Sequence, residues 1–127
     1  MIDHIGVRVA ELGRSRAFYE AALAPLGVSV IATVPAHVTG FGDVLGFGDQ
    51  RPFFWISQAP QPTAPLHLAF SAASRSQVDA FHAAALAALG QDNGAPGVRA
   101  HYHPTYYGAF VIDPDGHNVE AVCHAPE

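Results

Sequence analysis

The chain has 127 residues with 11 acidic and 6 basic side chains, for a formal net charge of −5, and every basic residue is an arginine. Without lysine it can form neither a Schiff base nor a lysine-containing phosphate loop. Six scattered arginines on an acidic chain also give no basic patch for nucleic acid. The length predicts a single domain over 1–127, and no apolar run is long enough to cross a bilayer.

The N-terminus lacks a basic segment followed by an apolar one, and the chain has a single cysteine. These features predict a cytoplasmic protein with neither a membrane partner nor an intramolecular disulfide. The many alanines favour a bacterial source. Against this low content of charged residues, eight histidines are a large supply of side chains for metal binding and proton transfer.

The first half of the chain predicts a strand, a helix and three further strands. His4 lies in the short alternating run 3–7, and residues 11–23 have the apolar spacing of an amphipathic helix, with Gly27 as its stop. The β-type runs that follow are residues 28–34, 37–41 and 53–57. A proline-rich linker over 59–65 then ends the first half.

The second half predicts the same order of elements. His67 lies in the alternating run 66–70, and a helix is expected from the cap Ser74 to about Leu89, before a turn at 91–94. The β-type runs that follow are residues 97–102, 106–112 and 118–124, the last two joined by the Asp-Pro-Asp-Gly turn at 113–116.

Two segments show that the halves are duplicates. Residues 17–27 (AFYEAALAPLG) and 80–90 (AFHAAALAALG) are identical at most positions, and the same offset of 63 carries His4 onto His67. We therefore predict an α+β fold of two tandem βαβββ modules, over 1–60 and 61–127.

Glu120 is a carboxylate within the small apolar strand 118–123. Burying an unpaired charge in such a strand costs on the order of several kcal/mol, so Glu120 needs a partner. Histidines on neighbouring strands, or a metal held by both, would supply it. His4, His67 and Glu120 together make a two-histidine, one-carboxylate set, which leaves positions on a metal open to water or substrate.

These residues, together with the segment Asp-Pro-Asp-Gly-His-Asn-Val-Glu at 113–120, resemble the vicinal oxygen chelate superfamily over the whole chain. That group includes glyoxalase I, fosfomycin-resistance proteins, extradiol dioxygenases and bleomycin-resistance proteins. The resemblance implies curled mixed sheets that form a cup around one divalent ion (Fe, Mn, Ni or Zn) held by His4, His67 and Glu120. It also implies a small-molecule substrate and a homodimer. Whether His4 meets His67 within one chain or across the dimer stays open.

The chain departs from each subfamily in one respect. Glyoxalase I has a fourth ligand, a glutamate in the first module, and the two ways of aligning the modules place its equivalent at Ser57 or Phe54, neither a carboxylate. Extradiol dioxygenases usually carry a tyrosine ten residues before the glutamate, where this chain has Phe110. Fosfomycin-resistance enzymes need a cluster of basic groups, which a chain without lysine hardly supplies.

Three functions follow from the resemblance. The first is a glyoxalase-like metalloenzyme of lyase or isomerase type, whose metal acts as a Lewis acid on a substrate that chelates it through two oxygens. The alternatives are a metal-free drug- or metabolite-binding protein of the bleomycin-resistance type and an extradiol-type dioxygenase.

The remaining candidates surround this predicted metal site. Trp55, Phe54 and Tyr107 are expected to form an apolar substrate wall, and Tyr107 and His103 are the candidates for acid–base chemistry. His117 is expected to be exposed in its turn, and Cys123 to pack on the face opposite Glu120. His37, His101 and His124 have no assigned role, and the role of His103 stays open beyond this candidacy.

Overall fold

The structure is a computed structural model that describes residues 1–126. Its first half contains β1 (Ile5–Val9), α1 (Leu12–Leu23), the 3₁₀ turn η1 (Ala24–Leu26), β2 (Ser29–Val34), α2 (Ala36–Thr39), β3 (Val44–Gly48) and β4 (Pro52–Gln58). Its second half contains β5 (His67–Ser71), α3 (Arg75–Ala87), β6 (Gln91–Val98), β7 (Tyr107–Ile112) and β8 (Asn118–Cys123).

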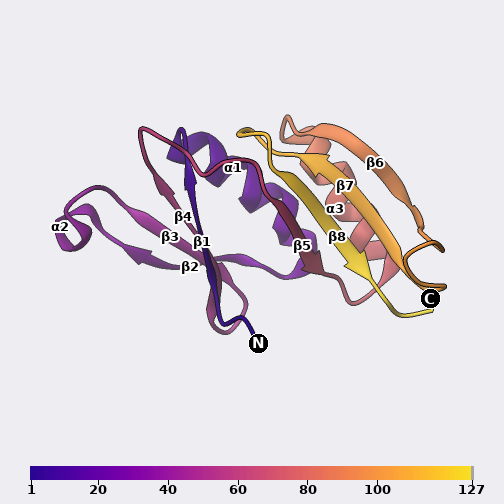
Figure 1. Cartoon of the computed structure of the whole chain (residues 1–127). Helices are drawn as coiled ribbons and strands as arrows, with labels where there is room; N and C mark the ends of the chain where they lie inside the picture. The colour runs from indigo at the N-terminus through magenta and orange to yellow at the C-terminus, as the bar shows by residue number, and fades with distance from the viewer. Residues whose placement is uncertain (127) are drawn as a thin grey trace.

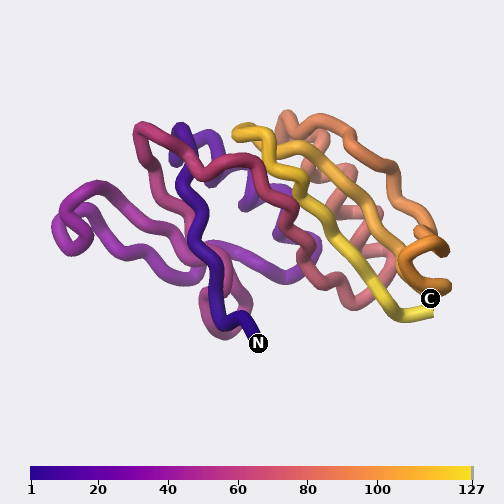
Figure 2. Tube along the Cα trace, viewed as in Figure 1, coloured from indigo at the N-terminus to yellow at the C-terminus, as the bar shows by residue number. Residues whose placement is uncertain are grey.

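The strands form two four-stranded sheets with the same order, β1-β4-β3-β2 and β5-β8-β7-β6 (Figure 1). In each sheet the first strand pairs in parallel with the last, and the other neighbours are antiparallel. This repetition confirms the α+β fold with tandem βαβββ units. The two sheets lie side by side without closing on each other, and the trace in Figure 2 shows the β2–β3 arm projecting away from the rest of the chain.

Both long helices begin at side-chain caps. Glu11 precedes α1 and accepts a hydrogen bond from the backbone N–H of Arg14 at 3.2 Å, and Ser74 does the same for Gln77 before α3. Such caps satisfy N–H groups that have no partner within the helix. After α1 and η1, Gly27 takes a φ of 78°, which turns the chain into β2.

The core lies between the helices and one face of each sheet. Helix α1 packs against α3 and β4, and α3 packs against β6, β7 and β8. An aromatic cluster joins the modules: the ring of Tyr19 on α1 lies 4.9 Å from that of Phe54, and Phe54 lies 5.4 Å from Phe70 on β5. The Tyr19 hydroxyl also donates to Asp113 in the β7–β8 turn, so a buried polar contact connects the first helix to the second module.

The structure differs from the predicted elements in three places. Residues 37–41, expected as a strand, contain the short helix α2, because Pro35 precedes it, Asp43 accepts the N–H of Ala36 at 2.9 Å, and Gly40 ends it with a φ of 83°. Strand β3 at 44–48 was not predicted from its glycine-rich sequence. Strand β6 covers 91–98 rather than 97–102, as an irregular edge strand with register shifts around Gly94.

The glycines of β3 are there because neighbouring groups approach closely. A Cβ on Gly46 would lie 2.8 Å from the Trp55 ring of β4, and a Cβ on Gly48 would collide with the Arg51 carbonyl. The glycines of this segment therefore indicate close packing between strands and not a loop. None of the helices over residues 1–126 is long and apolar enough to cross a membrane.

Candidate functional site

Strand register divides the residues of the second sheet between two faces. Val119, Ala121 and Cys123 of β8 are buried on the face that α3 covers, and this confirms the expected packing role of Cys123. Glu120 lies on the other face, directly opposite Ala69 of β5 and Phe110 of β7. We call this second surface the open face, because no helix packs on it.

Glu120 and His67 form the polar centre of the open face. The Nε2 atom of His67 lies 2.8 Å from Oε1 of Glu120. The carboxylate is 0% exposed, whereas the imidazole is 55% exposed. The sequence-predicted pairing of this glutamate with a histidine on the neighbouring strand is thus present, with the carboxylate buried and the imidazole at the surface.

The second carboxylate oxygen of Glu120 has a different partner. Tyr106, one residue before β7, donates its hydroxyl to Oε2. Burial and the adjacent carboxylate raise the pKa of the Tyr106 phenol to about 12, so the phenol is a neutral donor at physiological pH. Tyr106 was not among the sequence-predicted site residues; its alternation with Gly108 and Phe110 along the chain is the signal that places it on the open face.

The rings of Phe110 and Tyr106 lie beside the pair. The ring of Phe110 lies 6.1 Å from the His67 ring. The same Phe110 ring also contacts the Arg99 guanidinium, at 5.3 Å. These rings help to exclude water from Glu120. The result is a small polar centre in an aromatic setting, with one exposed imidazole.

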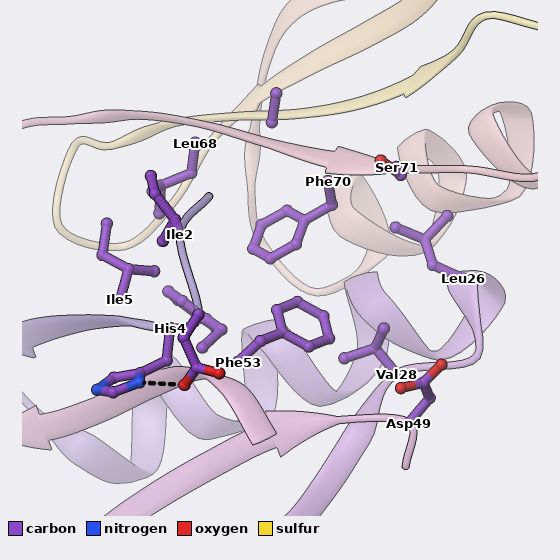
Figure 3. Close-up of a pocket in the computed structure, with 13 residues that line it drawn as sticks. Ile2, His4, Ile5, Leu26, Val28, Asp49, Phe53, Leu68, Phe70 and Ser71 are labelled. Atoms are coloured by element: carbon purple, nitrogen blue, oxygen red, sulfur yellow. Dashed lines mark hydrogen bonds and ion pairs between the residues drawn. The ribbon is translucent and has the colours of Figure 1, made fainter. Parts of the chain in front are cut away.

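His4 lies at the entrance to β1, in the other sheet. Its Nδ1 atom is 2.7 Å from Asp3, its side chain is 59% exposed, and Asp3 also contacts Arg51 at 2.7 Å. Hydrogen bonding from His4 and the charge of Arg51 lower the pKa of Asp3. Figure 3 shows His4 at one side of a cavity of about 430 Å³, in which Phe53 and Phe70 come from different modules. Asp3 also lines this cavity.

The structure therefore brings together two of the three expected ligands. His67 and Glu120 are in contact, whereas the polar partner of His4 is Asp3. Within residues 1–126, no group of three or more His, Cys, Asp or Glu side chains is arranged to hold a metal ion. A single chain, as far as the structure describes it, offers a two-donor site.

The register also identifies the counterpart of Glu120 in the first module. Gly6 of β1 pairs with Trp55, and its repeat partner Ala69 pairs with Glu120. The counterpart is thus Trp55, and both expected positions, Ser57 and Phe54, are wrong. The simple offset fails because the stretch between the helix and the last strand differs in length between modules.

Trp55 lines a second cavity of about 580 Å³, together with His4 and Val44. The cavity lies on the corresponding face of the first sheet, which we also call its open face. The Trp55 indole lies against Gly46. The first module therefore presents an aromatic wall where the second presents a carboxylate. The volume is in the usual range for small-molecule sites.

The other candidates lie elsewhere. Phe54 is fully buried in the aromatic core, and it also lines the first cavity. Tyr107 lies on the α3 side of its sheet, where its hydroxyl donates to Asp79 at 2.6 Å, and the structure does not bring it to Glu120. His103 is exposed, and its ring lies 6.2 Å from that of His124.

His117 corrects a further expectation, because it is fully buried and not exposed. Its Nδ1 accepts the backbone N–H of Leu66 at 2.9 Å, and its backbone N–H donates to Asp113 at 2.8 Å. The imidazole thus fixes the β7–β8 turn to the chain entering β5. Its role is in the placement of the strands that carry His67 and Glu120.

Comparisons with known proteins agree with this architecture. Residues 1–121 match the model of the Glyoxalase/Bleomycin resistance protein/Dioxygenase superfamily. A glyoxalase/bleomycin resistance protein from Albidiferax ferrireducens is similar in structure, with 31% identity, a TM-score of 0.78, and coverage of 97% of this chain and 98% of that one. No curated protein sequence matches the chain.

Two more distant structures share the fold. A glyoxalase I mutant from Zea mays has 21% identity and a TM-score of 0.72, over 95% of this chain and 46% of that one. A fosfomycin resistance protein from Listeria monocytogenes has 17% identity and a TM-score of 0.69, over 97% and 92% of the two chains.

Proposed function

Because the chain belongs to the glyoxalase/bleomycin resistance protein/dioxygenase superfamily, we propose that it is a glyoxalase-like metalloenzyme acting on a small substrate with two adjacent oxygens. The observation that carries the proposal is the contact between His67 and the buried carboxylate of Glu120 on an open sheet face. Fe, Mn, Ni and Zn are all compatible with imidazole and carboxylate donors.

The donor chemistry of this pair fits a divalent ion. A carboxylate fully removed from water is costly unless a cation or strong donors stabilise it, and a divalent ion held by both side chains would do so. The half-exposed His67 ring leaves one side of the pair open. When bound, the ion would supply Lewis acidity toward the substrate oxygens.

We propose that His4 of a second copy supplies the third donor. His4 precedes His67 by the repeat offset of 63 residues, stands directly before β1 where His67 begins β5, and lines the Trp55 cavity. The second copy would also bring its Trp55 wall toward the His67–Glu120 pair. Strands β1 and β5 are edge strands of their sheets, and such an association would use the edge of β5 and the part of β1 ahead of Arg8, which already bonds Thr63 of the linker.

In this arrangement the chain's own residues hold and shield the reacting groups. Phe110 and Tyr106 cover the carboxylate against water, and Tyr106 holds its proton on the hydroxyl that contacts Oε2. Trp55 offers a flat apolar surface to the substrate. We propose a lyase or isomerase reaction, in which no change of oxidation state is required of the metal.

A metal-free binding protein is the second candidate, and one observation favours it. Both oxygens of Glu120 already have donors within the chain, His67 and Tyr106, so the carboxylate is partnered without an ion. Such a protein would use the Trp55 cavity to bind a drug or metabolite without transforming it.

Metal analysis of the purified protein separates the two candidates. After anaerobic reconstitution with each divalent ion, the enzyme hypothesis expects about one ion per chain in the wild type, and a loss of that ion in His67→Ala and Glu120→Gln. A conservative control is His101→Ala, which removes an exposed imidazole outside the site. Equal, near-zero metal in the wild type and the variants would reject the enzyme hypothesis.

Mixed dimers test the shared site. His4→Ala and Glu120→Gln each lack a donor in every site, but a dimer with one copy of each has one complete site if the donors come from two chains. After subunit exchange, about half of the dimers are mixed, so we expect about a quarter of the wild-type metal content. No recovery on mixing would reject the shared site.

A further inference from the structure

The two oxygens of Glu120 have different environments. Oε1 faces the half-exposed imidazole of His67 at 2.8 Å, whereas Oε2 accepts a hydrogen bond from the Tyr106 hydroxyl. The carboxylate is fully buried, so neither oxygen exchanges its partner with bulk water. The carboxylate therefore has one oxygen directed toward the histidine side of the site and one held on the opposite side.

We propose that Tyr106 is a positioning residue that occupies Oε2, so that Glu120 offers a divalent ion only its Oε1. This inference rests on the proposed function, because it specifies how the same site holds the metal. A carboxylate bound through one oxygen leaves more of the coordination sphere open to a chelating substrate than one bound through two.

The backbone around Tyr106 keeps its ring in place. Its N–H donates to the carbonyl of His103 at 3.0 Å, and its carbonyl accepts the N–H of Arg99 at 2.7 Å. The ring packs edge-on against Tyr102 at 5.0 Å and against His124 at 5.2 Å. Contacts on the main chain and on two sides of the ring limit rotation of the phenol away from Oε2.

Gly108 makes the contact sterically possible. A Cβ at this position would lie 3.1 Å from Oε2 of Glu120 and 3.2 Å from the Tyr106 ring. A side chain here would therefore require the carboxylate or the phenol to shift from its present position. The sequence Tyr106-Tyr107-Gly108 therefore supplies the donor and the space for it within three residues, on the strand adjacent to Glu120.

The effect on a metal follows from the hydrogen bond. Groups that orient a metal-binding carboxylate typically change metal affinity about 10–100-fold when they are removed. Without the hydroxyl, Oε2 loses its donor and becomes free to bind the ion beside Oε1. We expect weaker binding, because the carboxylate is no longer held in one orientation, together with a higher coordination number.

Cobalt(II) provides the test, since its visible absorption weakens as the coordination number rises. We would titrate wild-type protein, Tyr106→Phe and Tyr102→Phe with Co²⁺ after checking the folded state of each by circular dichroism. Tyr102→Phe is the matched control, because its ring contacts Tyr106 but its hydroxyl does not bind Glu120. The proposal expects about 10–100-fold weaker Co²⁺ binding and a less intense spectrum for Tyr106→Phe alone.

Each other outcome overturns the proposal. If Tyr106→Phe binds Co²⁺ with unchanged affinity and spectrum, Tyr106 does not position the carboxylate, while the metalloenzyme hypothesis stands. The same holds if a crystal structure of the Co²⁺-loaded wild type shows both oxygens of Glu120 on the ion. If the wild type binds no Co²⁺, this inference and the proposed function fail together.

Discussion

Replacing Tyr19 with phenylalanine removes one hydroxyl from the contact between the two modules. In the native protein this hydroxyl donates to Oδ2 of Asp113, a residue that is only 5% exposed. The other oxygen of Asp113 accepts the N–H groups of Asp115 at 2.9 Å and His117 at 2.8 Å, so the carboxylate cannot turn to find a substitute. The substitution therefore leaves a buried carboxylate oxygen without its donor.

The expected cost is that of a hydrogen bond to a charged group, about 1.5–3 kcal/mol in the free energy of unfolding. For a domain of this size, one kcal/mol lowers the unfolding temperature by about 3–4 °C, so Tyr19→Phe should unfold about 5–12 °C below the wild type. Urea denaturation and calorimetry measure the two quantities independently.

Tyr107→Phe is the matched control, because it removes a phenol–carboxylate hydrogen bond at the surface, to Asp79 at 2.6 Å. Solvent replaces an exposed partner, so we expect a loss of about 0–1 kcal/mol. If Tyr19→Phe and Tyr107→Phe unfold at the same urea concentration, burial does not set the value of the bond and the reasoning is refuted.

Two further predictions concern packing and pH. Gly46→Ala should destabilise the protein by about 1–3 kcal/mol, because the new Cβ meets the Trp55 ring. Gly6→Ala is the control: a Cβ there has nothing within 4 Å, so this variant should be neutral or slightly stabilising. Urea titrations followed by the fluorescence of the single tryptophan distinguish the two variants. Burial and Asp113 raise the pKa of Tyr19 well above 10.0, so the stability from its protonated form is complete below that pH and is lost as the pH rises above it. Urea midpoints measured from neutral to alkaline pH should fall in the wild type, and fall less in Tyr19→Phe.

Much of the fold could be predicted from local pattern. Helix α1 was evident from its apolar spacing and its glycine stop, α3 from its serine cap, and the strands with His67 and Glu120 from alternation around small apolar residues. Helix α2 depends on the local residues Pro35, Asp43 and Gly40, but a helix of four residues is too short to show a helical periodicity. Strand β3 could not be predicted, because its glycines are required by contacts with neighbouring groups. A side chain at Gly46 would clash with the Trp55 ring, but in the sequence alone this glycine is indistinguishable from a loop glycine.

The candidate site was predicted in part. The buried carboxylate required a partner, and His67 on the neighbouring strand is that partner. Tyr106 was missed, although the turn at 113–116 pairs Phe110 with Glu120 and Tyr106 has the same parity as Phe110 along the chain. The position of His4 relative to the pair was inaccessible from the sequence, since it depends on whether the modules of one chain close on each other.

The two modules use one backbone plan for different chemistry, and a glycine accompanies the change in each. In the first module, Gly46 opens space for the indole of Trp55, and in the second, Gly108 opens space for Glu120 and its phenol donor. Trp55 and Glu120 occupy equivalent positions in their sheets. One chain therefore carries one aromatic wall and one carboxylate, and under the proposed function a complete site needs both. Since the open faces of one chain do not close on each other, the duplication is consistent with two copies that each complete the site of the other.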